Sequence, residues 1–285
     1  MKQFTIKSPI SLEGIGVHSG KTCKIVIEPA PCNSGIVYIR PPYDNDRSIV
    51  AADYKNVSDT TMCTRITNEF GITVSVIEHI SAAFYGLGVA NALVKLEEGD
   101  EIPFLDGSSL HFVEAIEDVG LQKQSEERRK IRILREVKIG DEKKWASLSP
   151  FEHFLVNVRC DFFAKGLKTE PFVYDSAVDN FKKDVAGART FGFFSDVEYL
   201  RKNNLAIGAS LENTVVFESD GRVMNPEGLR YHDEPVRHKL LDAIGDLSLS
   251  QYEIIGRYDA FCPGHNINNL LLRELFKDEG NYILE

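Results

Sequence analysis

The sequence has few cysteines, and their arrangement excludes the structural classes that depend on them. There are five: Cys23, Cys32, Cys63, Cys160 and Cys262. The number is odd, and none of them forms a Cys-x-x-Cys pair, whereas disulfide-stapled secreted domains carry even, closely spaced sets. Residues 1–6 alternate as a first strand does and lack the apolar core of a signal peptide. We therefore expect reduced thiols and a cytoplasmic location.

Basic clusters and long apolar runs are also missing. The 285 residues include 33 Lys and Arg against 43 Asp and Glu, which gives a formal net charge of −10. Without a basic block or arm, a nucleic-acid partner is not expected. No apolar run approaches the ~20 residues that a membrane span requires. The sequence predicts a protein without a membrane span, although transient contact with a membrane surface stays open.

The composition is that of a globular protein, with 43% hydrophobic and 27% charged residues, and the length allows two domains. Each half has several strands, a helix with a histidine near its start, a further strand and a last helix. This order suggests two copies of one unit. We predict an α+β fold of two similar domains, each a β-sheet with helices packed on one face and each with a small insert, which together enclose the active-site cleft.

The boundary between the two domains is predicted near residue 124. Residues 122–130 are polar and unpatterned, which is typical of a linker. We expect an N-terminal domain over residues 1–124 and a C-terminal domain over 125–285. Residues 191–217 predict a βαβ insert with a short helix at 196–202.

Residues 234–246 predict the helix on which the candidate site is centred. An acid and a proline suit its first turn, and apolar residues follow at three- and four-residue steps. His238, Asp242 and Asp246 recur every fourth residue, so they lie along one face of the helix. An imidazole and a carboxylate one turn apart can bind one metal ion. From the spacing alone a solvated polar face is the simpler interpretation, so support for a metal site must come from elsewhere in the chain.

A second histidine-bearing helix offers that support. Residues 72–87 run from strand into helix, with Glu78 and His79 at the helix start. A hydrolytic zinc site has three protein ligands and one open position, and His79 would complete the set begun by His238 and Asp242. Adjacent helical residues diverge by about 100°, so Glu78 would instead face the attacking water as a base. Taken alone, Glu78 and His79 also fit a purely structural interpretation, in which His79 is a buried histidine and Glu78 is an acid that complements the helix dipole.

A proton donor for a leaving amine is also present. His265 lies in a glycine-flanked loop, and Asp246 could hold its imidazole and favour the charged form. The His-Glu-x-x-His pattern of many zinc peptidases is absent, because residues 80–83 follow His79 without a second histidine. A closed structural zinc site is disfavoured, because no cysteine adjoins the three ligand positions.

Six short motifs occur in order along nearly the whole chain. They are Glu78-His79, Glu101-Ile-Pro-x-x-Asp106-Gly-Ser, Ala188-Arg-Thr-Phe-Gly-Phe193, Asn225-x-x-Gly-Leu-Arg-Tyr231, Val236-Arg-His-Lys-x-Leu-Asp-x-Ile-Gly-Asp-Leu247 and Gly264-His265. As an ordered set, the motifs resemble the UDP-3-O-acyl-N-acetylglucosamine deacetylase family. That family catalyses the committed step of lipid A synthesis. The resemblance covers about residues 1–276.

The resemblance implies roles for the site residues. It implies zinc bound by His79, His238 and Asp242, although ferrous iron suits these ligands nearly as well. Glu78 would be the general base and His265 the general acid. Further catalytic and nucleotide-contacting residues are implied as follows: Asp246 paired with His265, Thr190 as an oxyanion donor, Phe191 by the nucleotide and Lys239 near the pyrophosphate.

An apolar passage for the acyl chain is implied in the insert. Its residues are Phe193, Val197, Ile207, Ser210 and Val216. From the sequence alone, a small hydrophobic satellite cluster fits them equally well.

The sequence therefore predicts a zinc-dependent amidohydrolase that acts, as a monomer, on a small molecule, an acylated UDP-amino sugar, and releases acetate. Two alternatives remain open. One is a zinc hydrolase of another amide substrate, and the other is a non-catalytic protein that binds a nucleotide sugar.

Overall fold

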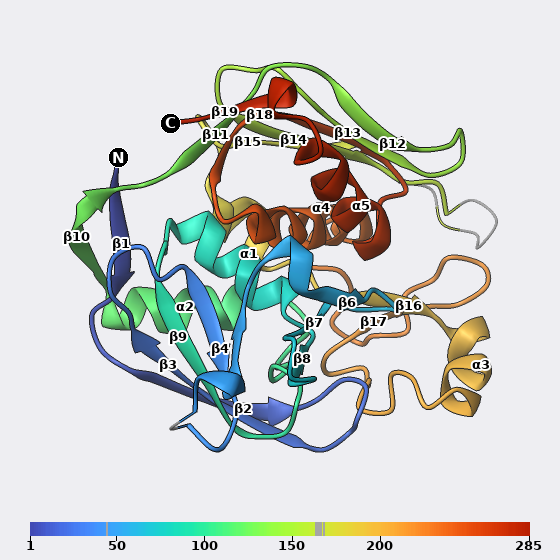
Figure 1. Ribbon diagram of the computed structural model, residues 1–285. Coiled ribbons are helices and arrows are strands. Elements are labelled where there is room, and N and C mark those ends of the chain that lie inside the picture. The colour runs from blue at the N-terminus through green and yellow to red at the C-terminus, as the bar shows by residue number, and fades with distance from the viewer. Residues whose placement is uncertain (44, 163–166, 168) are drawn as a thin grey trace.

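The computed structural model describes residues 1–285 apart from 44, 163–166 and 168. Its main helices lie in the middle of the molecule, with strands of the first half of the chain on one side and strands of the second half on the other (Figure 1). These helices are α1 (Glu78–Leu87), α2 (Leu110–Val119), α4 (Glu234–Leu247) and α5 (His265–Leu275). The predicted α+β class is confirmed.

The first half of the chain contributes a main sheet and two smaller ones. The main sheet has the order β2 (Ile10–Ile15), β3 (Thr22–Pro29), β9 (Ala92–Glu98), β4 (Ile36–Ile39) and β5 (Ile49–Ala51). A smaller sheet joins β6 (Val57–Asp59), β7 (Arg65–Thr67) and β8 (Thr73–Ser75). Because β8 ends three residues before α1 begins, this small sheet fixes where the helix with His79 starts.

The second half forms one large mixed sheet. Its strands are β11 (Lys130–Ile133), β12 (Val137–Gly140), β13 (Trp145–Ser149), β14 (Phe154–Arg159), β15 (Phe172–Asp175), β18 (Glu253–Phe261) and β19 (Tyr282–Leu284). The long strand β18 pairs in parallel with β14 and β11 and antiparallel with β13. It leads directly into the loop before α5, and so carries His265 to the middle of the molecule.

The predicted linker is a strand. Residues 121–127 form β10 (Leu121–Glu127), which pairs antiparallel with β1 (Lys2–Ile6). The predicted linker over 122–130 therefore has regular structure, which its unpatterned sequence does not indicate. β10 is largely solvent-exposed on both faces, so it shows no alternation of apolar and polar residues. The predicted domain boundary falls inside β10 and stays a prediction.

The predicted insert region holds strand, helix and strand. β16 (Phe191–Phe193) and β17 (Val215–Phe217) pair in parallel, and α3 (Val197–Lys202) lies between them in the chain. Together they project to one side of the helical layer (Figure 1).

Helices α1 and α4 pack against each other across the centre. The stripe of Val236, Leu240, Ile244 and Leu247 is buried, as the periodicity predicts. The polar stripe of α4 is buried as well, so the interpretation as a solvated face is wrong. Gly245 makes the close approach possible, because a Cβ there would lie 2.1 Å from the carbonyl oxygen of Glu78.

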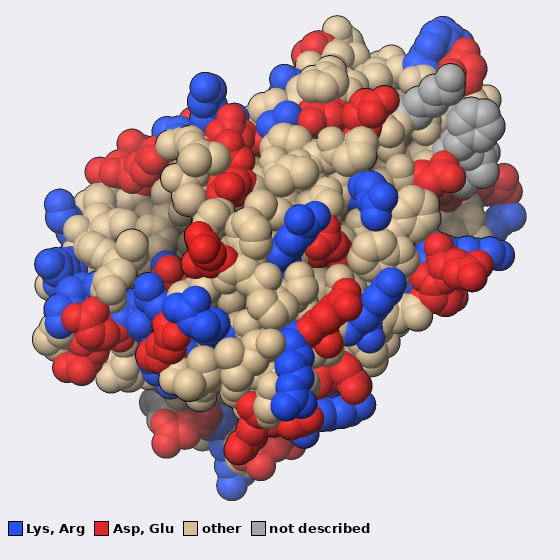
Figure 2. Space-filling model, turned by 90° about the horizontal axis from the view of Figure 1, so that it is seen from above, with Lys and Arg blue, Asp and Glu red and all other residues tan. Residues whose placement is uncertain are grey.

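Two surface properties bear on partners. On the face that Figure 2 shows, acidic and basic side chains are interspersed rather than separated into patches of one sign. Within the described part of the chain, every helix is too short or too polar to cross a bilayer.

Candidate functional site

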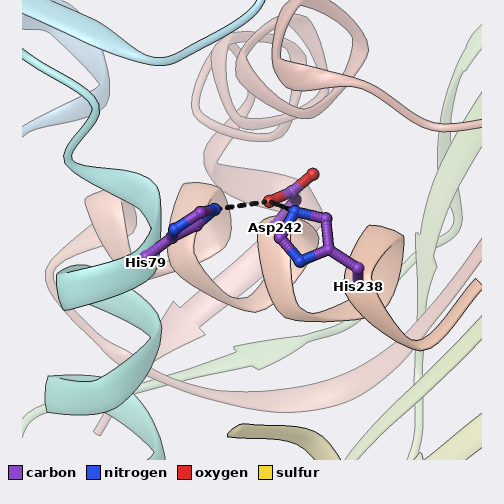
Figure 3. Close-up of side chains that lie close together, drawn as sticks. All are labelled: His79, His238 and Asp242. Atoms are coloured by element: carbon purple, nitrogen blue, oxygen red, sulfur yellow. Dashed lines mark ion pairs between the residues drawn. The ribbon is translucent and has the colours of Figure 1, made fainter. Parts of the chain in front are cut away.

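Three buried side chains from α1 and α4 point toward one another (Figure 3). Oδ1 of Asp242 lies 3.6 Å from Nε2 of His79 and 3.3 Å from Nε2 of His238. One ligand atom from each residue lies within 4.8 Å of the others. Among the described residues, this is the only group of three or more His, Cys, Asp or Glu side chains placed so closely. The geometry can hold one metal ion.

The unpaired atoms of this cluster fit a cation. Oδ1 of Asp242 is buried and has no hydrogen-bond partner, although buried polar atoms normally have one. Nδ1 of His238 lies 3.0 Å from the carbonyl oxygen of Ala188, so Nδ1 carries the hydrogen and the Nε2 lone pair faces the cluster. Burial lowers the pKa of His238 to about 3, so its imidazole is neutral. Two nitrogen donors and a carboxylate oxygen are ligands that zinc prefers.

Lys239 engages the other oxygen of the carboxylate. Its Nζ donates to Oδ2 of Asp242 at 2.7 Å and lies 5.8 Å from the ring centre of Phe191. Burial alone would raise the pKa of Asp242, but His238 and the Lys239 ammonium outweigh it and hold the pKa well below its usual value. The carboxylate is therefore ionised, with Oδ1 left to face the histidines.

Glu78 stands beside the three-residue group and is not a member of it, as the helical angle predicts. The backbone N–H of Thr64 donates to its Oε2 at 3.0 Å, and its Oε1 lies 3.9 Å from Nε2 of His265. Burial raises the pKa of the Glu78 carboxyl. A carboxylate with a raised pKa is better able to accept a proton at neutral pH.

His265 forms a charged pair with Asp246. Its Nδ1–H donates to Oδ2 of Asp246 at 2.9 Å, and the same carboxylate accepts from the side chains of Asn268 at 2.8 Å and Thr64 at 2.6 Å. Burial alone would lower the pKa of His265, but Asp246 and Glu78 raise it to about 9. The imidazole therefore carries a proton at neutral pH, which suits a general acid.

A cavity of about 780 Å³ joins these groups to the insert. Apart from Asp246, which lies behind His265, its walls contain every site residue that the sequence predicts. They are Glu78, His79, Thr190, Phe191, Phe193, Val197, Ile207, Ser210, Val216, His238, Lys239, Asp242 and His265. The structure therefore brings together segments that lie almost 190 residues apart in the chain. The individual roles of these residues stay predictions.

The loop with Thr190 is fixed from both sides. The backbone N–H of Thr190 donates to the carbonyl of Gly107 at 2.8 Å. Gly107 has φ +78°, and a Cβ there would lie 2.0 Å from the carbonyl oxygen of Asn213, so only glycine fits. The preceding Arg189 is fully buried and pairs with Glu234, the first residue of α4, at 2.9 Å. The cavity wall is thereby tied to the helix that bears His238.

Sequence reasoning missed three supporting residues. Thr64 contacts both Glu78 and Asp246, Asn268 bridges Asp246 and the hydroxyl of Tyr258, and Arg189 ties the Thr190 loop to α4. Thr64 and Asn268 carry no spacing signal, because their partners lie 10 to 182 positions away and no helical or strand repeat links them. Arg189 lies in the motif Ala188–Phe193, where a charged residue among mostly apolar neighbours was the available signal of a buried ion pair.

Comparison with known proteins identifies the family of the chain. The family model described as UDP-3-O-acyl N-acetylglycosamine deacetylase matches residues 3–277. A UDP-3-O-acyl-N-acetylglucosamine deacetylase of Shewanella loihica is 43% identical over 279 residues, which cover 97% of this chain and 90% of that protein. The protein of the same name from a Psychrobacter species is 40% identical over 284 residues, with coverage of 99% and 94%. The chain therefore belongs to the UDP-3-O-acyl-N-acetylglucosamine deacetylase family.

Proposed function

We propose that this protein hydrolyses the acetamide of UDP-3-O-acyl-N-acetylglucosamine and releases acetate, the committed step of lipid A synthesis. Membership of the family supports this activity. The observation that carries the chemistry is the buried group of His79, His238 and Asp242, whose free carboxylate oxygen faces two imidazoles in the wall of a large cavity.

The metal is zinc in this proposal, held by His79, His238 and Asp242. When bound there, zinc acts as a Lewis acid on the amide carbonyl and on water. Ferrous iron has similar ligand preferences and is the alternative. Elemental analysis of protein purified without added metal decides between them, with one zinc per chain expected and iron in its place as the contrary result.

Glu78 takes the proton of the attacking water. Its position beside the ligands, its raised pKa and the fixed hydrogen bond from Thr64 support the role of base. Thr190 donates a hydrogen bond where negative charge develops on the carbonyl oxygen. Glu78→Gln should keep its metal and lose most turnover. Full activity in the metal-loaded variant would refute the role of base.

His265 returns a proton to the leaving amine. Its pKa of about 9 keeps it charged at neutral pH, and the bond to Asp246 orients the ring. Once the amine leaves, the C–N bond is broken, acetate is formed and the sugar amine carries the new N–H. The two sides of the reaction are therefore served by different groups, Glu78 on the water side and His265 on the amine side.

The remaining cavity wall suits the two ends of the substrate. Lys239 and Phe191 offer a cation and an aromatic face to the pyrophosphate and nucleotide. The insert offers apolar side chains to the acyl chain, including Val197, Ile207 and Val216. Because both regions line one cavity with the metal group, a bound sugar can place its acetamide at the ligands while its two substituents diverge.

The insert also supports transient contact with a membrane surface. Phe194, Ile207 and Leu211 line the cavity and are exposed to solvent. An acyl chain that enters between them would leave the lipid–water boundary with little exposure to water. A monomeric state and a cytoplasmic location complete the proposal. Co-sedimentation with anionic vesicles that is weakened in Phe194→Ser would support membrane contact, and equal sedimentation of both proteins would contradict it.

The test of the function is the appearance of both acetate and free amine from the purified substrate. Metal-loaded protein should form the two products in equal amounts. Intact substrate after long incubation, despite measurable binding, would favour a non-catalytic nucleotide-sugar-binding protein. Turnover of simpler acetamides with no preference for the UDP sugar would favour a hydrolase of another amide.

A further inference from the structure

Cys160 and Cys262 lie side by side where two paired strands end. Arg159, the last residue of β14, is the register partner of Phe261, the last residue of β18, in a parallel pairing. The pairing continues one step further, because the N–H of Cys262 donates to the carbonyl of Arg159 at 2.7 Å. Neighbouring strands lie about 4.8 Å apart, which is within the ~4.4–6.8 Å between Cα atoms that a disulfide bridges.

The two thiols form a contact pair in the wall of the cavity. All five cysteines of the chain are free thiols. The thiols of Cys160 and Cys262 are close enough for each to shift the pKa of the other. The backbone N–H of Asp161 also donates to Sγ of Cys262 at 3.2 Å. Both cysteines line the cavity, and Cys262 is the more exposed of the two. Reagents that enter the cavity can therefore reach Cys262.

The environment makes the two thiols unequal. The neighbouring Cys160 thiol lowers the pKa of Cys262 to about 6, so that Cys262 is largely thiolate at neutral pH. Cys262, together with burial, raises the pKa of Cys160. A reactive thiolate beside a protonated second thiol is the arrangement of a peroxide-sensitive cysteine with its resolving partner.

We propose that Cys160 and Cys262 form a redox modification site, at which a peroxide converts the two thiols into a disulfide. The Cys262 thiolate attacks one peroxide oxygen, so the O–O bond breaks and a sulfenic acid forms while the other oxygen leaves as water. The sulfur of Cys160 then attacks the sulfenic sulfur, and the S–S bond forms with loss of a second water. Two thiols and one hydrogen peroxide give one disulfide and two waters. A small dithiol reverses the change.

The disulfide also affects turnover, a second part of the proposal that rests on the proposed function. Cys262 lies three positions before His265, and the link would tie this turn to the end of β14. A displacement of about 1 Å in a catalytic group can cost up to ~100-fold in rate. We expect the oxidised protein to have a kcat lower by roughly an order of magnitude.

Mass spectrometry tests the modification itself. Metal-loaded protein with Cys32→Ser, which removes an exposed thiol that could link two molecules, is treated with hydrogen peroxide and then with an alkylating reagent. We expect a linked peptide that contains Cys160 and Cys262, two hydrogen atoms lighter than the thiol form, and its loss after treatment with a dithiol. Alkylation of both thiols after peroxide treatment, or a link to another cysteine, would overturn the proposal.

Two single variants separate the roles of the thiols. In Cys160→Ser, peroxide should leave Cys262 as a sulfenic acid that a dimedone probe traps. In Cys262→Ser, Cys160 should remain a thiol after peroxide treatment, and the alkylating reagent should label it. The buried Cys23 and Cys63 serve as internal controls, because burial raises the pKa of both thiols. Equal oxidation of Cys160 in the presence and absence of Cys262 would contradict the assignment of Cys262 as the reactive thiolate.

The measurement of kcat tests the effect on turnover independently of the mass spectrometry, which tests the disulfide. Fully oxidised protein should regain its kcat when the dithiol reduces it. Equal kcat in both forms would overturn the effect on turnover, while the linked peptide still decides whether the site exists. Absence of activity in the reduced, metal-loaded protein would instead count against the proposed function.

Discussion

Nδ1 of His265 donates to Oδ2 of Asp246 at 2.9 Å, in a pocket where both side chains are buried. This contact decides the charge of the imidazole. Burial alone would keep the ring neutral, whereas the carboxylate, with the help of Glu78, raises its pKa to about 9. The pair thus converts an ordinary histidine into an acid that still carries its proton at neutral pH.

Asp246→Asn should therefore move the basic limb of the activity profile. A general acid must be protonated, so activity is lost as pH rises through the pKa of His265, near pH 9 in the native protein. Without the carboxylate charge this pKa falls, and the loss should begin at lower pH. The measurement is kcat from about pH 6 to about pH 10. Asp259→Asn, at a partly buried residue of β18 that pairs with Arg257, is the control. A basic limb unchanged in Asp246→Asn would argue against His265 as the acid.

Thr64→Val should slow the reaction without preventing metal binding. The hydroxyl of Thr64 donates to Asp246 at 2.6 Å, and hydrogen bonds to charged groups contribute roughly 1.5–3 kcal/mol. We expect kcat to fall about tenfold to a hundredfold, and Thr64→Ser to restore most of it. Thr67→Val, which removes an exposed hydroxyl bonded to Ser58, is the control. A Ser variant as slow as the Val variant would show that the methyl group, not the hydroxyl, matters.

Local patterns account for most of what the sequence could predict. The spacing of apolar residues predicts a helix over 234–246, and α4 occupies that position, because a helical stripe depends only on neighbours along the chain. The same spacing places His238 and Asp242 one turn apart. The similar order of elements in the two halves then pointed to His79 as the third ligand, and the resemblance implies the same residue.

Contacts between distant segments were beyond reach. Thr64 and Asp246 lie 182 residues apart, and neither belongs to a pattern that names the other. The strand β10 is polar on both faces, so only its partner β1 reveals that it is a strand. Burial of the polar stripe on α4 likewise depends on α1, which covers it. These features follow from tertiary packing, which sequence periodicity does not encode.

Gly245→Ala should separate the two helices that hold the ligands. The added Cβ would lie 2.1 Å from the carbonyl oxygen of Glu78, so α1 must move. Overpacking of this kind costs about 1–3 kcal/mol, and the shift moves His79 away from Asp242. We expect weaker metal binding together with a lower free energy of unfolding. Gly192→Ala, where a Cβ meets nothing within 4 Å, is the control for both measurements. Native metal affinity in Gly245→Ala would contradict the role assigned to the close approach.

Metal removal should inactivate the protein and lower its thermal stability. An ion bound by three residues of the folded state, and absent from the unfolded chain, stabilises the fold by mass action. We expect zinc to raise the melting temperature of chelator-treated protein and to have little effect in His79→Gln. The control is His111→Gln, which changes an exposed histidine beside Asp106 and Glu114. Equal zinc stabilisation of the native protein and His79→Gln would show that the ion binds elsewhere.

Arg189→Met should destabilise the fold more than any surface substitution of the same kind. The guanidinium is buried, with Nε 2.9 Å from Glu234, and its loss leaves that carboxylate buried without its partner. Breaking a buried pair in this way costs about 3–5 kcal/mol. Urea unfolding measures the loss, with Arg222→Met as the control because Arg222 pairs with Asp220 in solvent. Arg189 also holds the loop before Thr190, so the kcat of the folded variant, measured without urea, should fall as well. If Arg189→Met is slow but as stable as the native protein, the arginine positions the loop without supporting the fold. If Arg189→Met and Arg222→Met lose equal stability and equal kcat, Arg189 has neither role.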